Sequence, residues 1–276
     1  MRLGTRQSRM APEESGAVAR AIAWSTAVLL VVPMVVVVAL AVNGSQYVQF
    51  QLPPDDVSLK WLREVADSPL WRSALMQSVK VALLSAVLAT ALGTACALGI
   101  RNSRYAGVVQ TLMLLPLIVP LIVTALAIYP LWVDLGLLGT TAGLVIGHTV
   151  VAMPFAFLTV WSSVGTLDPQ LEKAAASLGA GSWQVLRRVT LPLIAPALLA
   201  SVIVAAAMSF DEIIVSLFIA SPQTQTMPVV LWSHLRENLD PTVAAASVFM
   251  AAMNLVILFV GIAAGRWAVK RRGAAR

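Results

Sequence analysis

Two consecutive carboxylates, Asp211 and Glu212, lie inside a long apolar run and are the side chains best suited to bind a cation. A carboxylate in the hydrocarbon core of a membrane costs on the order of 3 kcal/mol, so such residues face a cavity, a partner cation or a substrate. No Lys or Arg lies at comparable depth in the other apolar runs, so a cationic solute would satisfy the charge directly. Because the acids are consecutive, only one of them points straight at a given site. The alternative is a structural carboxylate that is hydrogen-bonded to Ser209, Ser216 or His148.

The composition indicates an integral membrane protein. Of the 276 residues, 59% are hydrophobic and 12% are charged, whereas about a quarter of the residues are charged in soluble globular domains. The net charge of +6 does not indicate nucleic-acid binding, because the basic residues are scattered and no RNA-binding motif accompanies them. The single cysteine, Cys96, is expected to be a small core residue.

No pattern in the sequence indicates catalysis, a metal site or a bound cofactor. The sequence pairs no nucleophile with a base, and its two histidines, His148 and His234, lie too far apart in sequence to suggest a site. It also lacks the Gly-x-x-x-x-Gly-Lys-Ser/Thr loop that holds nucleotide phosphates. We therefore expect no enzymatic activity, no catalytic or metal-binding residue and no cofactor, and we expect any ATP to be bound by another chain.

Six apolar segments predict an all-α, polytopic membrane protein. A helix of about 20 apolar residues crosses the hydrocarbon core. Prolines predict an irregular, bent helix in the third segment and a break at Pro154 in the fourth. The fifth segment is expected to continue as one helix through both acids. The predicted spans are 21–42, 73–100, 106–132, 141–163, 196–220 and 241–265.

The distribution of basic residues predicts the orientation. A transmembrane domain over 21–265 would be flanked by cytoplasmic tails at 1–20 and 266–276, with the polar stretch 43–72 and the loop 221–240 outside. This arrangement puts 14 of the 19 Lys and Arg residues on the cytoplasmic side, as the positive-inside rule requires. A cleavable signal peptide is the alternative for the first span, although its apolar run is longer than the usual run of about 7 to 15 residues.

Between the fourth and fifth spans, the polar segment 168–196 predicts a helix-turn-helix elbow. Asp168 is a suitable N-cap before a proline at the first helical position. Gly179 is expected to end this first helix. Ser182 is then expected to cap a second short helix, which Pro192 ends. One face of the first helix carries an apolar stripe of Leu171, Ala174, Ala175 and Leu178.

At these residues the sequence resembles the permease subunits of binding-protein-dependent ABC importers. The family pattern is Glu-Ala-Ala, three residues, Gly, nine residues, an aliphatic residue, one residue and Leu-Pro. The spacing matches throughout, with Lys173-Ala174-Ala175, then Gly179, then Val189-Thr190-Leu191-Pro192. The one departure is Lys173, which stands where the family has Glu. Glu172 is the alternative source of an ionic contact with the ATPase, although it lies about 100° away around the helix.

The resemblance implies that the elbow is a coupling helix seated in a cleft of a cytoplasmic ATPase. It also implies an ATPase dimer, a second permease subunit and an extracytoplasmic solute-binding protein as partners, in the cell inner membrane. A plain helical hairpin on the membrane surface is the alternative interpretation. The implied coupling residues are Glu172, Lys173, Ala174, Ala175, Gly179, Leu191 and Pro192.

The sequence around the two acids is similar to the fifth span and following loop of spermidine/putrescine importer permeases. The similar stretches are 208–216, Ser221-Pro222, Thr226-Met227-Pro228 and Leu231-Trp232. This resemblance implies that the protein moves a small cationic solute inward by alternating access, with Phe210, Asp211 and Glu212 in the substrate pathway. The alternatives are an ABC importer permease for another small solute, and a secondary transporter or channel that uses Asp211 as an ion site.

Overall fold

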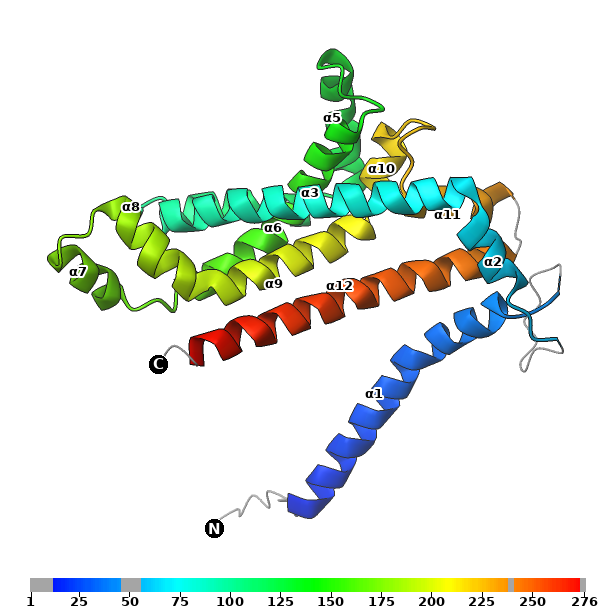
Figure 1. The fold of residues 1–276 in the computed structure, drawn as a ribbon, viewed down its shortest axis with the longest axis horizontal. Coiled ribbons are helices and arrows are strands. Elements are labelled where there is room, and N and C mark those ends of the chain that lie inside the picture. The colour runs from blue at the N-terminus through cyan, green and yellow to red at the C-terminus, as the bar shows by residue number, and fades with distance from the viewer. Residues whose placement is uncertain (1–11, 46–55, 238–240, 274–276) are drawn as a thin grey trace, which may run out of the picture.

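The computed structural model describes residues 12–45, 56–237 and 241–273, and within these ranges the chain is built of helices joined by short connections (Figure 1). Most of the helices lie roughly along one direction, with α7 and α8 at one end of the molecule and α2 and α11 at the other. The elements in chain order are α1 (Pro12–Ala41), α2 (Lys60–Asp67), α3 (Pro69–Ile100), α4 (Ala106–Ile118), α5 (Leu121–Asp134), α6 (Thr141–Val164), α7 (Pro169–Ser177), α8 (Ser182–Val185), the π-helix η1 (Leu186–Thr190), α9 (Leu191–Phe210), α10 (Ile214–Ile219), α11 (Met227–Glu237) and α12 (Pro241–Gly273).

Helices α3, α6 and α9 form the centre of the bundle, and small side chains line the seam between them. Small residues let helix backbones approach closely, which is the usual basis of helix packing in membranes. The backbones approach closely at Gly93 of α3, where an added Cβ would lie 2.9 Å from the backbone nitrogen of Phe157 on α6. The buried alanines of the seam are Ala86, Ala89, Ala152, Ala156, Ala205 and Ala206.

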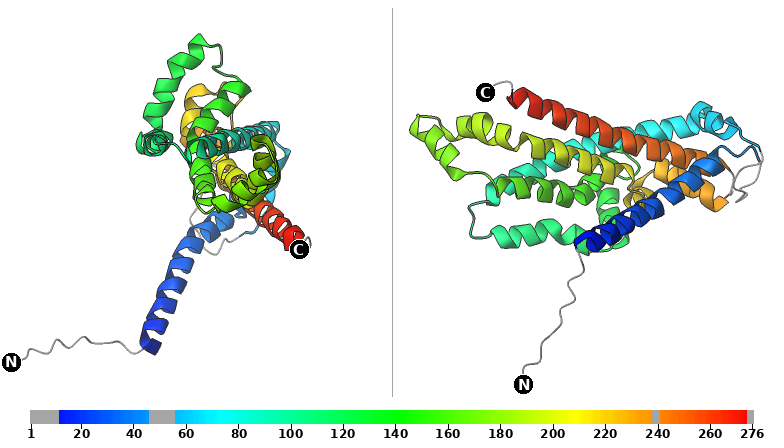
Figure 2. Two further views of the ribbon diagram at one scale, coloured as in Figure 1. Left: turned by 90° about the vertical axis from the view of Figure 1, so that its left-hand side faces the viewer. Right: turned by 90° about the horizontal axis from the view of Figure 1, so that it is seen from below.

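Helix α1 diverges from the bundle and joins it near the C-terminal end of the helix (Figure 2). There Ala41 belongs to a buried cluster with Trp61 of α2, Trp71 of α3 and Ala245 of α12. Farther toward the N-terminus its apolar side chains are exposed, as Leu29 is at 74%. This exposed length suits contact with lipid or with another membrane-embedded helix.

The third apolar segment folds as two helices, α4 and α5, whose axes differ by 100°. Val119 is extended and Pro120 precedes α5 with φ −54° and ψ 131°. The cause is local, because a proline disfavours helical geometry at the residue before it and has no N–H to give to the preceding turn. The prediction of a bent helix here is confirmed, and the bend is a complete break in the helix. The break predicted at Pro154 is wrong, because α6 continues through this proline from Thr141 to Val164.

Two segments predicted to lie outside contain helices, so the prediction of a loop over 221–240 is wrong in part. In 43–72, α2 forms because Trp61 and Val65 lie four residues apart and are both buried. In 221–240, α11 forms with four consecutive buried residues at its start. Both helices cover the same end of the bundle.

The terminal helices extend beyond the predicted spans. α1 begins at Pro12, within the predicted tail 1–20, and α12 continues to Gly273, beyond the predicted span end at 265. The parts of the predicted tails at 1–11 and 274–276 lie outside the described residues. Within the described ranges, five helical segments are long and apolar enough to cross a membrane, and the α4–α5 pair would make a sixth.

Candidate functional site

The helix that carries the two acids is interrupted at them. α9 ends at Phe210 and α10 begins at Ile214, so the prediction of one continuous helix through both acids is wrong. The Glu212 carboxylate accounts for the break, because it accepts hydrogen bonds from the backbone N–H of Val215 (3.0 and 3.1 Å) and of Ser216 (3.3 Å). The first N–H groups of a helix have no backbone partner within that helix. The carboxylate therefore supplies the acceptor atoms that backbone carbonyl groups would supply in a continuous helix.

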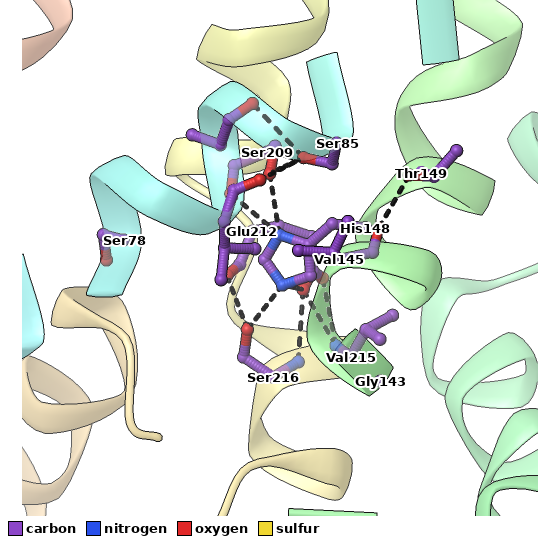
Figure 3. Close-up of polar contacts among 12 residues, drawn as sticks. Ser78, Ser85, Gly143, Val145, His148, Thr149, Ser209, Glu212, Val215 and Ser216 are labelled. Carbon is purple, nitrogen blue, oxygen red and sulfur yellow. Dashed lines mark hydrogen bonds and ion pairs between the residues drawn. The ribbon is translucent and has the colours of Figure 1, made fainter. Parts of the chain in front are cut away.

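A buried polar network surrounds Glu212 and centres on His148 of α6 (Figure 3). The imidazole Nδ1 lies 2.8 Å from the hydroxyl of Ser209, and Nε2 lies 2.7 Å from the hydroxyl of Ser216 and 3.7 Å from the Glu212 carboxylate. Ser85 of α3 donates to the Ser209 hydroxyl at 2.8 Å. The network thus joins α3, α6, α9 and α10 at one level of the bundle. His148 and Ser216, two of the three partners considered for a structural carboxylate, indeed lie beside Glu212.

Asp211 has a different environment from its neighbour. Its side chain is exposed, whereas Glu212 is 6% exposed. The Asn254 amide of α12 donates to the Asp211 carboxylate at 2.8 Å, and the amide oxygen of Asn254 is buried with no hydrogen-bond partner among the described residues. The exposed Asp211 carboxylate therefore presents acceptor oxygen to solvent and suits a solute that donates hydrogen bonds. Phe210, the third predicted pathway residue, is 1% exposed and lies inside the bundle.

The first helix of the elbow, α7, begins and ends as its sequence predicts. The Asp168 carboxylate accepts from the backbone N–H of Gln170 at 2.9 Å, which is the N-cap contact. At the other end Gly179 has φ +86°, and the N–H groups of Gly179 and Ala180 donate back to Ala176 and Ala175. This is the Schellman arrangement, in which the residue after the helix adopts the left-handed conformation that glycine favours. The turn of the elbow therefore depends on Gly179.

The second half of the elbow differs from the prediction. The N-cap is Gly181 and not Ser182, with the Gln184 side chain accepting from the Gly181 N–H at 3.2 Å. The helix also does not end at Pro192, since α8, η1 and α9 form one uninterrupted helical segment from Ser182 to Phe210. Pro192 lies in the first turn of α9, directly after the π-helical turn. A wider turn of this kind accommodates the missing N–H of a proline within a helix.

Glu172, one of the two candidates for a charged contact with an ATPase, is engaged within the chain. Its carboxylate binds both terminal nitrogens of the Arg101 guanidinium, with Nη1 at 2.9 Å from Oε1, and it accepts from the Thr190 hydroxyl. The pKa of the Glu172 carboxyl is lowered chiefly by the Arg101 hydrogen bonds, with desolvation opposing this effect and the Thr190 hydrogen bond adding to it. Sequence reasoning missed Arg101 as the partner of Glu172, because 71 residues separate the two.

The other predicted coupling residues form the outer surface of the elbow and its junction with α9. Lys173 and Ala174 are exposed, Ala175 is half-buried, and Leu191 and Pro192 open α9. Three large apolar side chains on the elbow are exposed, namely Leu171 (47%), Leu178 (89%) and Trp183 (68%). Within the described ranges, no three His, Cys, Asp or Glu side chains lie close enough together to hold a metal ion.

Known proteins with similar sequences are membrane permeases. The spermidine/putrescine transport system permease protein PotC of Shigella flexneri is 26% identical over 246 residues, which cover 88% of this chain and 92% of that protein. The putrescine transport system permease protein PotI of Escherichia coli is 27% identical over 249 residues, with coverage of 84% and 88%. The molybdenum transport system permease protein ModB of Mycobacterium tuberculosis is 30% identical over 240 residues, with coverage of 80% and 91%.

Solved structures with the same fold belong to bacterial ABC transporters. A chain of a transporter that imports the acidic polysaccharide alginate superimposes with a TM-score of 0.70 at 17% identity, covering 92% of this chain and 96% of that one. A chain of the inward-facing MetNI methionine transporter gives a TM-score of 0.62 at 17% identity, covering 71% of this chain and 94% of that one.

The family model named binding-protein-dependent transport system inner membrane component matches residues 89–271. This match includes the C-terminal part of α3, all of α6 and α9, both acids and the whole elbow. The chain belongs to this family, and it is the permease subunit of an ABC importer and a multi-pass protein of the inner membrane.

Proposed function

We propose that this permease moves a small cationic solute inward, namely a polyamine such as putrescine or spermidine. The observation that carries the proposal is the exposed Asp211 carboxylate at the break between α9 and α10. No Lys or Arg pairs with it among the described residues, and its contact there is the neutral amide of Asn254. An ammonium group of the solute would supply the missing positive charge. The relatives PotC and PotI, whose names state spermidine and putrescine transport, support the same assignment.

The proposed topology has six spans with both termini in the cytoplasm. The bent pair α4–α5 serves as the third span, and the elbow lies between the fourth span, α6, and the fifth, α9. Arg101, Lys173, Arg187 and Arg188 then share the elbow's end of the molecule, and this concentration of basic residues supports a cytoplasmic location. Alternating access would bring Asp211 into contact with each side of the membrane in turn.

The proposed role of the elbow is to transmit ATP hydrolysis from a separate ATPase dimer. Its exposed Leu178 and Trp183 support this role, because large apolar side chains gathered on a polar segment mark interaction surfaces. The remaining proposed partners are a second permease subunit and an extracytoplasmic binding protein. A related fold has been solved in complex with a pentasaccharide-bound periplasmic protein, which supports the second of these.

An anionic solute is the second candidate, since the sequence relatives include a molybdenum permease and the fold relatives include an importer of an acidic polysaccharide. The exposed carboxylate of Asp211 favours the cation, because like charges brought together in a pathway repel each other. A single carboxylate without a basic neighbour would hinder an anion at that point.

The test is uptake by the complex that copurifies with this chain from native membranes, reconstituted in liposomes with its binding protein. ATP-dependent accumulation of labelled putrescine, competed by spermidine and not by molybdate, is the expected result. Competition by molybdate alone would overturn the polyamine assignment and leave the family assignment intact. Uptake driven by an ion gradient without ATP would instead support a secondary transporter that uses Asp211 as an ion site.

A further inference from the structure

The first helix of the elbow, α7, is held to the bundle with little help from apolar packing. None of its residues is buried, and Leu178, which belongs to its apolar stripe, is 89% exposed. The short helix α8 has no buried residue either, but it is continuous with α9, and this continuity sets its direction. A segment without buried apolar contacts has a low free energy of local opening, so polar contacts must fix the position of α7.

The polar contact that meets this need is the group of Glu172, Arg101 and Thr190, which we call the clasp. Each member comes from a different part of the chain, with Arg101 at the C-cap of α3, Glu172 in α7 and Thr190 at the end of η1. The Arg101–Glu172 pair is bidentate, which fixes orientation as well as distance. Thr190 is 3% exposed and donates its hydroxyl to the same carboxylate. One side chain of the elbow is thus tied to the ends of two membrane helices.

The clasp also bridges an open space. A cavity of about 660 Å³ lies beneath the elbow, and its lining includes Leu98, Arg101, Glu172, Ala176, Ser182 and Thr190. Because the space between α7 and the end of α3 is not filled by side chains, the angle of the elbow is set by the contacts that cross it. The side chains of Arg101 and Glu172 are 27% and 19% exposed, so water screens the pair only in part.

We propose that the clasp is the device that fixes the elbow relative to α3 and α9, and that Glu172 acts on the ATPase by this positioning and not by touching it. This inference rests on the proposed coupling role of the elbow. It makes Glu172 a positioning residue, and it assigns Arg101 and Thr190 to the coupling machinery. Lys173, its neighbour in α7, is exposed and has no acidic partner among the described residues, so it remains available to a partner surface.

The test uses the complex in nanodiscs for the distance measurements and in liposomes for uptake, with four sets of substitutions in this chain. Glu172→Gln and Arg101→Gln each remove one charge of the pair, and the double change Glu172→Arg with Arg101→Glu exchanges the charges. Lys173→Gln is the matched control, because it removes a charge from the adjacent position of the same helix. Spin labels at Ser177 of α7 and Ala95 of α3, both exposed, report the distance between the elbow and the bundle in a Cys96→Ala background.

We expect each single clasp variant to broaden the distance distribution and to lower ATP-driven uptake about tenfold, the size of effect that losing a hydrogen-bonded charge pair produces. We expect the charge exchange to restore a narrow distribution and to recover uptake to within about threefold of wild type. Lys173→Gln should leave the distance distribution unchanged. The clasp would be overturned if both single variants kept the wild-type distance distribution. It would also be overturned if the charge-exchange variant had a distribution as broad, and uptake as low, as the single variants.

Failure of the clasp can be distinguished from failure of the coupling role. Leu178→Asp places a charge on the most exposed apolar side chain of the elbow and does not touch the clasp. If Leu178→Asp releases the ATPase while the clasp variants behave as wild type, the coupling role stands and the clasp is wrong. If the clasp variants broaden the distances while every elbow variant keeps the ATPase and full uptake, the elbow does not couple and the inference about Glu172 falls with it.

Discussion

At the scale of single residues, two adjacent carboxylates differ in burial and in hydrogen-bond partners. Glu212 is buried and bound by the N–H groups that open α10, and His148 lies beside it. Asp211 is exposed, and an amide on α12 donates to it. The environment favours a structural carboxylate at Glu212 and a solute contact at Asp211. Substitution of each acid by its amide separates these roles, because the shape is kept and the charge is lost.

Asp211→Asn should lower polyamine uptake at least about tenfold while the complex assembles normally. The physical reason is that an exposed carboxylate contributes attraction for a cation and little to packing, so its loss affects transport first. The measurement is initial uptake of labelled putrescine against the amount of intact complex. Asn254→Ala, which removes the neighbouring amide and keeps the charge, should have the smaller effect. Wild-type uptake by Asp211→Asn would show that the solute is not recognised as a cation at this position.

Glu212→Gln should reduce the amount and thermal stability of the permease more than it reduces uptake per folded molecule. The amide carries an NH2 donor where the carboxylate has its second acceptor oxygen. Because both carboxylate oxygens accept from the Val215 N–H, that NH2 group faces a buried backbone donor, at a cost of about 1–3 kcal/mol. The measurement is the unfolding midpoint in detergent together with uptake normalised to folded protein. A variant with normal stability and no uptake would place Glu212 in the pathway instead.

The sequence identified both acids and named possible partners for a structural carboxylate. It did not show which of the two acids lies beside those partners. That choice depends on the break between α9 and α10, which is a competition between a side chain and the backbone for the same N–H groups. Hydrophobicity does not report such a competition, since the residues on both sides of the break are apolar. The Arg101–Glu172 pair could not be predicted from the sequence either, because the two residues are 71 positions apart and no local pattern connects them.

At the scale of elements, the elbow depends on one backbone conformation. Gly179 has φ +86°, which β-branched residues strongly disfavour. Gly179→Val should therefore let the protein reach the membrane yet fail to retain the ATPase. Gly181→Ala is the matched control, because Gly181 has φ −69° and open space around its Cα. The measurement is the ATPase recovered with the tagged permease, and equal recovery from both variants would contradict a role for the left-handed turn.

The seam between α3 and α6 gives a second prediction at this scale. Gly93→Val should destabilise the protein by about 1–3 kcal/mol, the usual cost of overpacking, because the added Cβ meets the backbone of Phe157. Gly99→Ala on the same helix should be tolerated, since no atom lies within 4 Å of the position of its Cβ. The measurement is the fraction of monodisperse protein after heating in detergent. Equal stability of the two variants would mean that the helices separate at little cost.

Element boundaries were predictable where local chemistry sets them and unpredictable where a longer helix overrides it. The Asp168 cap and the Gly179 turn follow from preferences of single residues. Pro192 should have ended a helix by the same reasoning, yet the π-helical turn of η1 carries the helix past it. The continuation buries Ile194 and Ser201 against the bundle, and this packing outweighs the local preference.

At the scale of the whole molecule, the chain has a buried centre and several exposed apolar surfaces that are suited to binding partners. The α3–α6–α9 seam is closed, while α1 diverges from it and the elbow presents exposed apolar side chains at one end. The sequence predicted the helical class and the spans from hydrophobicity alone. It did not predict how far α1 diverges, or that α5 turns by 100° from α4 and packs against α10, since these directions depend on contacts between distant segments.

The last prediction concerns assembly. The chain tagged at its N-terminus and extracted in mild detergent should copurify with an ATPase, a second permease and a binding protein, because its sequence has no nucleotide-binding loop of its own. Leu178→Asp should lose the ATPase selectively, at least about tenfold, and keep the second permease, since Leu178 lies on the elbow and away from the membrane helices. Leu235→Asp is the matched control, an exposed leucine on α11 at the opposite end of the molecule. Quantitative mass spectrometry of the purified complexes measures all three partners at once. Loss of the second permease together with the ATPase would mean that the elbow supports the whole assembly, whereas retention of the ATPase would place its docking surface elsewhere on the chain.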